Sequence, residues 1–215
     1  SIQLIETTFE AAKRIGTDKM GVPELFAHSV LTFSEHCGTH IDARSHGGFN
    51  DSWSEHIPLG KCYGPGLRLD LRHKRPGQPI TAADLEAALQ KESYALKGGE
   101  IVLLWTGAAD YNGEPRYLTD HPGMVGESAE WLIDRGVQVM GIDAPGFDLP
   151  IQTMLERKDP WPCHRLFKTR EYWHIENLAN LGAIPRAHGF RVSALPLKWT
   201  HATGTHIRAV AILED

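Results

Sequence analysis

Polar and apolar residues alternate in two early stretches of the chain, which is the pattern of a strand with one buried face. Residues 29–34 (SVLTFS) show it, and in residues 66–72 (GLRLDLR) it places Leu67, Leu69 and Leu71 on a single face. Both stretches are predicted to be strands. The first leads directly into a segment rich in histidine.

Predicted helices and strands alternate in the middle of the chain. Residues 80–91 begin with Thr81 and an aspartate three residues later, a capping pattern, and continue with helical spacing. Residues 100–107 (EIVLLWTG) are an unbroken apolar run ended by glycine, typical of a buried strand. The same succession of helix and strand recurs at 128–136 and 137–143. Further strands are predicted at 172–178, 191–197 and 205–213.

This order predicts a single α/β domain spanning residues 1–215, with a mixed sheet. The length of 215 residues suits one domain, and a net charge of −5, with neither sign gathered into a long run, offers no surface for nucleic acid. The partner we expect is a small molecule.

Cysteine usage and hydropathy indicate where the protein works. The three cysteines form neither a C-x-x-C pair nor an even disulfide framework, which is typical of a reducing compartment. No apolar stretch approaches the roughly 20 residues needed to span a bilayer, and the start of the chain lacks a signal-peptide pattern. We therefore expect a soluble cytoplasmic protein with no membrane partner.

Candidate chemistry concentrates in the segment HCGTHIDARSH. In an extended strand His36, His40, Asp42 and His46 would share one face, because their positions are all even. A straight strand would hold His36 and His40 about 13 Å apart, so a common site requires a bend. Gly38 lies between them and supplies the backbone freedom for one. Because imidazole and carboxylate groups bind divalent ions such as zinc and manganese, the segment predicts a metal site.

The same segment has a structural interpretation, in which it is an empty, hydrogen-bonded turn. Arg44 lies inside it, and pairing between Arg44 and Asp42 would replace a cation. A catalytically inactive metal-binding or structural oligomer therefore stays open as an alternative. Cys37 has the opposite parity and is expected to be a buried neutral thiol rather than a nucleophile.

The segment resembles the H-x-G-T-H-x-D-A-P-x-H motif of the metal-dependent cyclase family, which includes bacterial kynurenine formamidase, isatin hydrolase and related lactone hydrolases. Further matches follow in the family's order: LLWTG, then GIDAPGFD at 141–148, then His164, then ENLANL from Glu176. The end RAVAIL resembles the family's closing strand. The resemblance covers roughly residues 25–213.

The resemblance implies a swivelling β/β/α fold, a homodimer or homotetramer, and hydrolysis with one or two divalent ions, zinc or manganese. In the first implied metal site the ligands are His36, His40 and Asp42. A second ion would be held by His164, with Asp42 and Glu176 bridging the two. The implied catalytic residues are His46, which would transfer the proton, and Glu176, which would complete the coordination.

Several positions depart from the family pattern. Arg44 stands where the family has proline, and Gly146 stands where it usually has serine. The family's first strand is expected before residue 1. A second copy of GTHI, at 204–207, falls in the family's terminal strand, so we predict that His206 is a packing or rim residue rather than a ligand.

We hypothesise a hydrolase that cleaves the C–N bond of a small aromatic or cyclic amide, formamide or lactam. The ion would lower the pKa of its bound water from about 15.7 toward 7, and the resulting metal-bound hydroxide would attack the carbonyl carbon. His46 would move the proton. Phe49 and Trp53, just after the motif, are the candidates for lining the substrate pocket.

Other assignments remain open. The same site would also suit the C–O bond of a lactone. His174 shares strand parity with Glu176 and competes with His164 as a ligand.

An enzyme of another class, a non-haem iron oxygenase, would use His40 and Asp42 in a facial triad. Its third ligand would be His201 or His206, with Arg208 binding a keto acid.

Overall fold

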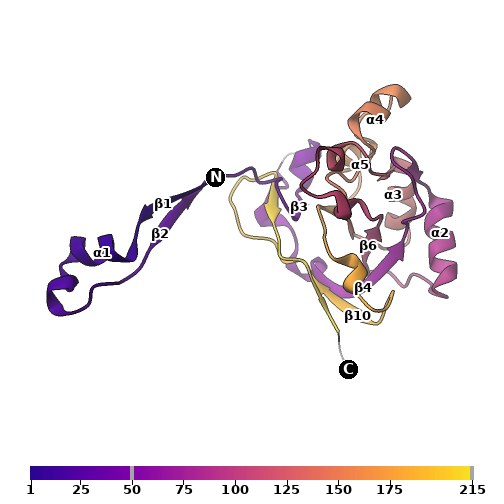
Figure 1. Cartoon of the computed structure of the whole chain (residues 1–215). Helices are drawn as coiled ribbons and strands as arrows, with labels where there is room; N and C mark the ends of the chain where they lie inside the picture. The colour runs from indigo at the N-terminus through magenta and orange to yellow at the C-terminus, as the bar shows by residue number, and fades with distance from the viewer. Residues whose placement is uncertain (49–50, 214–215) are drawn as a thin grey trace. The chain divides into compact units, whose positions relative to one another are not determined.

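The chain divides into two compact units, residues 1–34 and residues 35–215. The structure is a computed structural model that describes residues 1–48 and 51–213 (Figure 1). Its strands are β1 (Ile2–Glu6), β2 (His28–Leu31), β3 (His40–Asp42), β4 (Tyr63–Asp70), β5 (Pro79–Ile80), β6 (Ile101–Trp105), β7 (Gly123–Met124), β8 (Val139–Ile142), β9 (Trp173–Glu176), β10 (Phe190–Ser193), β11 (Gly204–His206) and β12 (Val210–Ile212). Its α-helices are α1 (Thr8–Ile15), α2 (Ala82–Lys91), α3 (Gly126–Ile133), α4 (Ile151–Arg157) and α5 (Pro162–Leu166). Seven 3₁₀-helices are described: η1 (Thr17–Met20), η2 (Arg44–Gly47), η3 (Ser54–His56), η4 (Leu59–Lys61), η5 (Ala108–Tyr111), η6 (Pro115–Leu118) and η7 (Leu181–Ala183). Among the described helices, none has the length and apolar character that crossing a membrane requires.

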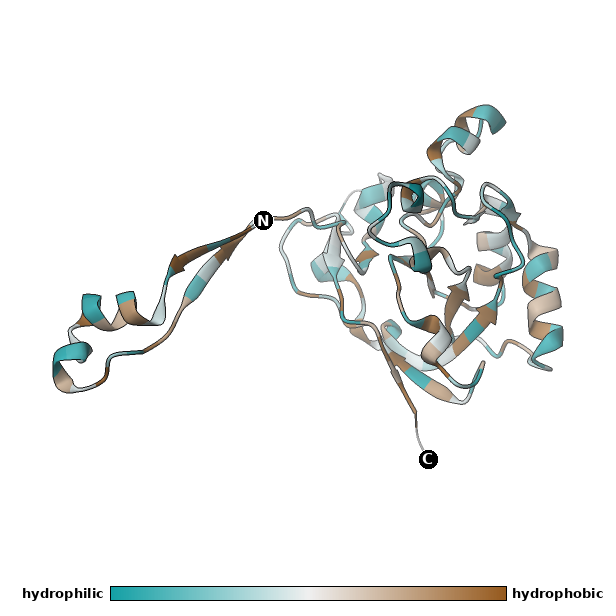
Figure 2. Ribbon diagram, viewed as in Figure 1, coloured by the Kyte–Doolittle hydropathy of each residue, from teal (hydrophilic) through white to brown (hydrophobic). Residues whose placement is uncertain are grey.

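The first unit is a β-hairpin that carries a short helix between its strands. β1 and β2 pair antiparallel, and α1 begins at Thr7 with a capping box completed by Glu10. The hydropathy colouring is mostly brown along β1 (Figure 2). The strand predicted at 29–34 therefore begins and ends earlier than expected, and it belongs to this hairpin.

The second unit is built on an eight-stranded sheet with the order β11-β3-β9-β8-β6-β4-β10-β12. The four central strands β9, β8, β6 and β4 run parallel, and the pairs outside them are antiparallel. β6 is buried on both faces, as its unbroken apolar sequence requires. The predicted α/β architecture with a mixed sheet is confirmed.

The chain connection between the sheet's two edges shows that this sheet is curled. β11 and β12 are its opposite edge strands, yet only residues 207–209 separate them along the chain. A flat sheet of eight strands would hold its edges about 34 Å apart, whereas this link spans about 15 Å at most. The single strand predicted at 205–213 is thus two strands, one on each edge.

Two apolar clusters fill the two faces of the curled sheet. On one face, α2 and α3 cover Leu67, Leu69 and Leu71, all fully buried, as the alternation in this stretch predicted. Helix α2 is capped by Thr81 in the predicted way. On the other face, Ile41 of β3 belongs to the second cluster. This packing fixes β3 beside β9, which is where the candidate chemistry lies.

Candidate metal centre

A tight bend before β3 brings two histidines of the HCGTHIDARSH segment together. Only His40–Asp42 is extended, and Gly38 adopts the left-handed conformation with φ of +66°. The ring centroids of His36 and His40 lie 5.0 Å apart. The bend predicted at Gly38 is therefore confirmed, since a straight strand would separate these two residues by about 13 Å.

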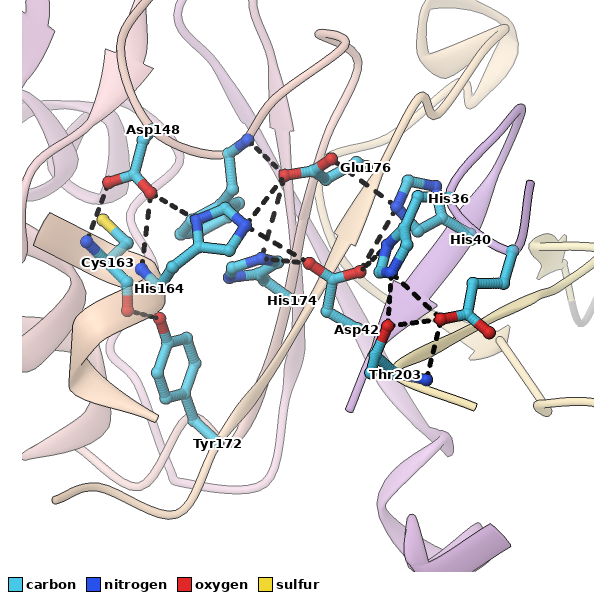
Figure 3. A network of polar contacts seen from close by, with 12 residues as sticks. His36, His40, Asp42, Asp148, Cys163, His164, Tyr172, His174, Glu176 and Thr203 are labelled. Carbon is cyan, nitrogen blue, oxygen red and sulfur yellow. Dashed lines mark hydrogen bonds and ion pairs between the residues drawn. The ribbon is translucent and has the colours of Figure 1, made fainter. Parts of the chain in front are cut away.

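Strand register then adds a carboxylate from β9. His40 pairs with Glu176 in the antiparallel β3–β9 ladder, and α5 contributes His164. Nε2 of His40 lies 3.2 Å from Asp42 Oδ1 and 3.6 Å from Glu176 Oε2. Nε2 of His164 lies 3.4 Å from Asp42 Oδ2 and 3.8 Å from Glu176 Oε1. Figure 3 shows the two carboxylates between the two imidazoles, so each carboxylate faces both.

These donor atoms have the spacing of a shared coordination sphere. Neighbouring ligands around a tetrahedral zinc ion with bonds of about 2.1 Å lie about 3.4 Å apart, close to the separations seen here. Within residues 1–48 and 51–213, two groups have ligand atoms all within 4.8 Å of one another: Asp42, His164, His174 and Glu176, and His36, Asp42 and His46. Asp42 belongs to both groups, as expected of a bridging ligand.

The outer nitrogens of two imidazoles are held by hydrogen-bond acceptors. Nδ1 of His40 donates to Gly38 O at 2.8 Å, and Nδ1 of His164 donates to Asp148 Oδ2 at 2.5 Å. In each ring Nε2 then faces the carboxylates, where it can hold a proton or bind a metal ion. Nε2 of His40 is fully buried and has no hydrogen-bond partner within the described chain. Burial alone would lower the pKa of His40, but Asp42 and Glu176 raise it, so in the metal-free site a proton can occupy Nε2, and a divalent ion can replace it among the same donors.

His174 differs from these two histidines. Its Nε2 lies 2.9 Å from Asp42 Oδ2, but its buried Nδ1 has no acceptor among the described residues. The ring stacks on Phe147, with centroids 4.5 Å apart. Burial and the neighbouring charge of His164 lower the pKa of His174 to about 4, so the ring is neutral. It is therefore suited to donate its Nε2 hydrogen to Asp42 rather than to bind a metal.

The two buried carboxylates have pKa values shifted in opposite directions. Burial, reinforced by the charge of Asp42, raises the pKa of Glu176 to about 7. Burial also opposes ionisation of Asp42, but the close ring nitrogens of His164, His174 and His36 outweigh it and hold the pKa of Asp42 well below its usual value. Glu176 is thus the carboxylate that holds a proton most readily when no cation is bound.

His46 lies at the rim of the site. It follows β3 in η2, and its ring centroid is 4.0 Å from that of His36 and 5.3 Å from that of His164. The ring is exposed on its outer side, and partial burial lowers the pKa of His46. A neutral imidazole at this position can accept a proton.

A cavity of about 280 Å³ opens beside the cluster, and its lining includes His46, His164 and Glu176. Leu118 and Trp161, both exposed, also line it. Phe49 and Trp53 were the sequence candidates for lining this pocket. Trp53 is not one of the described lining residues, and its ring lies 5.6 Å from that of His201. Phe49 lies outside the described residues.

Arg44 and Cys37 also have contacts that bear on the sequence interpretation. Nε of Arg44 donates to Phe167 O, while the oxygens of Asp42 face imidazoles. The alternative in which Arg44 replaces a cation therefore gains no support. The expectation that Cys37 is buried is wrong, because its side chain is exposed and lies 3.4 Å from His206 Nε2.

One supporting residue was missed at the sequence level. Asp148 accepts hydrogen bonds from the backbone N–H of Cys163 and from the ring of His164. Burial alone would lower the pKa of His164, but these contacts with Asp148 and Asp42 hold it well above its usual value. The signal was available, because Asp148 ends the GIDAPGFD stretch that matches the family pattern.

Comparison with known proteins decides what this cluster belongs to. The family model described as "Putative cyclase" matches residues 4–149. The chain belongs to this cyclase family. The kynurenine formamidase of Bacillus cereus is 33% identical over 185 residues, which cover 84% of this chain and 77% of that protein. The isatin hydrolase of Roseibium aggregatum is 26% identical over 201 residues, 87% of this chain and 75% of that protein.

Solved structures of cyclase-family proteins share the fold. An isatin hydrolase bound to the product analogue thioisatinate superposes with a TM-score of 0.82 at 24% identity, covering 100% of this chain and 82% of that chain. Isatin hydrolase A from Ralstonia solanacearum gives 0.83 at 23% identity, covering 100% and 81%. The predicted family and fold are confirmed, and this cyclase-family chain is a metal-dependent hydrolase whose His, Asp and Glu cluster suits a divalent ion.

Proposed function

We propose that this hydrolase cleaves the C–N bond of a small aromatic or cyclic amide, formamide or lactam. One observation carries the proposal. Nε2 of His40 is buried and faces two carboxylates, while Nδ1 of the same ring donates to Gly38 O. The relatives named kynurenine formamidase and isatin hydrolase support the choice of bond.

In this proposal the metal is zinc or manganese, bound as one or two ions. The first ion would be held by His36, His40 and Asp42. The second would be held by His164, with Asp42 and Glu176 shared between the two. Nitrogen and oxygen donors of this kind serve both metals.

A divalent ion in this site would lower the pKa of a coordinated water and polarise the substrate carbonyl. His46, neutral and at the cavity rim, accepts the proton of the attacking water and delivers it to the leaving nitrogen. Asp42 and Glu176 balance the positive charge, and the ring of His174 holds the outer oxygen of Asp42 in place. Phe147 N–H fixes Glu176 Oε1 at 2.7 Å.

The cavity supports a planar or compact substrate. Leu118 and Trp161 line it with exposed apolar side chains, and the described lining contains no lysine or arginine. The apolar part would contact the ring of a substrate, while His46 and His164 would lie beside its carbonyl.

A lactone would present the same carbonyl, so C–O cleavage is the second candidate at this site. The oxygenase alternative has less support, because its candidate third ligands have other contacts. Nε2 of His206 contacts Cys37, and His201 lies against Trp53.

The test is a rate screen with isatin, N-formylkynurenine and an unsaturated lactone, under argon, before and after loading metal-free protein with Zn²⁺ or Mn²⁺. We expect metal-dependent hydrolysis of at least one amide. His46→Ala should retain its metal and lose about a hundredfold to ten-thousandfold in rate, whereas Leu59→Ala, an exposed residue of η4, serves as a control with unchanged rate. Protein that takes up no metal, or that hydrolyses none of the three, would contradict the proposal.

We further propose that the chain forms a homo-oligomer, either a homodimer or a homotetramer. Large apolar side chains of residues 1–34 are exposed within that unit, including Ile2 at 74%, Phe9 at 54% and Met20 at 79%. Such a surface is typical of an interface. Light scattering should give a multiple of 23.9 kDa, and Phe9→Asp should lower that mass. A monomer at micromolar concentration would rule this out.

We also propose a cytoplasmic location. Its support is the absence of paired cysteines among the described residues, where Cys37, Cys62 and Cys163 are all free thiols. Cell fractionation tests it, and recovery from the periplasm or medium would overturn it.

A further inference from the structure

A chain of hydrogen bonds leads from His36 away from the candidate metal centre. Nε2 of His36 lies 2.9 Å from Thr203 Oγ1, and the backbone N–H of Thr203 donates to Glu35 Oε1 at 2.9 Å. The Thr203 hydroxyl also donates to Glu35 Oε1. Figure 3 shows Thr203 on the side of the His36 ring that is turned away from Glu176.

The direction of these bonds determines where the His36 hydrogen lies. A carboxylate offers only acceptors, so the hydroxyl hydrogen of Thr203 is committed to Glu35. The Thr203 oxygen must then accept, and the hydrogen between it and His36 belongs to Nε2. In the neutral ring the lone pair is therefore on Nδ1, which lies 2.9 Å from Asp42 Oδ1.

Gly204, the next residue, leaves the space that the His36 ring occupies. It stands opposite Asp42 in the β3–β11 ladder. A Cβ at this position would lie 2.5 Å from Cε1 and 2.8 Å from Nδ1 of His36. Since a methyl group cannot share that volume, Thr203 and Gly204 together set both the orientation and the position of the ring.

We infer that Thr203, backed by Glu35, positions His36 to bind the first metal ion through Nδ1. This inference rests on the proposed metal-dependent hydrolase. Backbone Gly38 O and the Asp148 carboxylate hold the outer nitrogens of the other two ligand imidazoles, and Thr203 with Glu35 does the same for His36. Thr203 and Glu35 act through His36 and are positioning residues.

The experiment compares Thr203→Val with Thr203→Ser in the full-length chain. Zn²⁺ is titrated calorimetrically into metal-free protein, and ¹⁵N NMR of the histidine rings identifies the tautomer of His36. A matched control is Thr205→Val in β11, two residues from Thr203, which removes a hydroxyl that donates to Leu197 O. Glu35→Ala is a second test variant. Its side chain is part-exposed, so its removal should not disturb the core.

Metal-free wild-type protein should show hydrogen on Nε2 of His36. Thr203→Val should bind Zn²⁺ about 10- to 100-fold more weakly, Glu35→Ala should also bind more weakly, and Thr203→Ser and Thr205→Val should match the wild type. Hydrogen on Nδ1, or unchanged affinity in both Thr203→Val and Glu35→Ala, would overturn the inference and leave the proposed function standing. Wild-type protein that binds no Zn²⁺ would overturn both.

Discussion

The sequence GTHI occurs twice, at 38–41 and at 204–207, and the two copies contribute to neighbouring antiparallel strands, β3 and β11. His40 and His206 are directly opposite each other in that ladder. One copy supplies a candidate metal ligand and the other does not, although the four residue types are identical. The difference must therefore come from what surrounds each copy.

The two histidines have different partners. His40 is fully buried, donates through Nδ1 to Gly38 O, and directs Nε2 at the two carboxylates. His206 is only half-buried, contacts Cys37 through Nε2, and has its ring 5.3 Å from that of Trp199. An imidazole is suited to bind a metal here where an outer acceptor holds one ring nitrogen and carboxylates face the other.

The two glycines are required for different reasons. Gly38 has φ of +66°, and nothing lies within 4 Å of the position its Cβ would take, so it is needed for its conformation. Gly204 is in a strand, and its Cβ would collide with the ring of His36, so it is needed for its small size. The second copy of GTHI thus supports the metal site that the first copy helps to form.

The largest difference between the copies should be seen when each histidine is removed. His40→Ala should weaken Zn²⁺ binding by more than about a hundredfold, exceeding the effect expected of an outer residue, and should abolish metal-dependent turnover. His206→Ala should leave both unchanged. Metal content by mass spectrometry, measured with rate, checks this. Equal losses in the two variants would remove the distinction between the copies.

Metal affinity should depend on pH at the first copy. Burial and the charge of Asp42 raise the pKa of Glu176 to about 7, so below pH 7 the metal-free site holds protons that an ion must displace. Zn²⁺ affinity should therefore rise with pH through pH 7, by about tenfold per unit for each proton released, and the raised pKa of His164 should extend the rise above pH 7. His206→Ala should show the same slope in calorimetric titrations. A flat profile between pH 5 and 7 would contradict the assignment of Glu176.

The smallest effects should separate the two glycines. Gly38→Ala should lower the free energy of unfolding by about 1 to 2 kcal/mol, because alanine is strained at positive φ. Gly204→Ala should instead weaken Zn²⁺ binding by about tenfold or less, through displacement of His36, with a smaller change in the stability of metal-free protein. Urea unfolding measures the stability of both variants, and calorimetry measures their Zn²⁺ affinity. Equal changes in stability and in Zn²⁺ affinity for the two variants would mean that the two glycines have the same role.

Part of this site could be predicted from local sequence. His36, His40 and Asp42 lie close in the chain, so strand parity and the freedom of Gly38 sufficed to bring them together. His164 and Glu176 were assigned only by family resemblance, because strand pairing and the packing of α5 determine their approach. Thr203 and Glu35 had no signal, since their role depends on the pairing of β3 with β11 across more than 160 residues.

The fold was predictable to a similar depth. The buried strands and the capped helix α2 followed from periodicity, because each needs only local burial or a local cap. The break between β11 and β12 could not be predicted, since the apolar run across 205–213 continues through it. The curl of the sheet, which sends the two halves of that run to opposite edges, is a property of the whole sheet.

The most direct test is the crystal structure of protein loaded with Zn²⁺, with diffraction data collected on both sides of the zinc absorption edge. An anomalous peak should lie about 2.0 to 2.2 Å from His40 Nε2 and from an oxygen of Asp42, with Nδ1 of His36 also in contact. A fully loaded crystal without a peak between these residues would contradict the account.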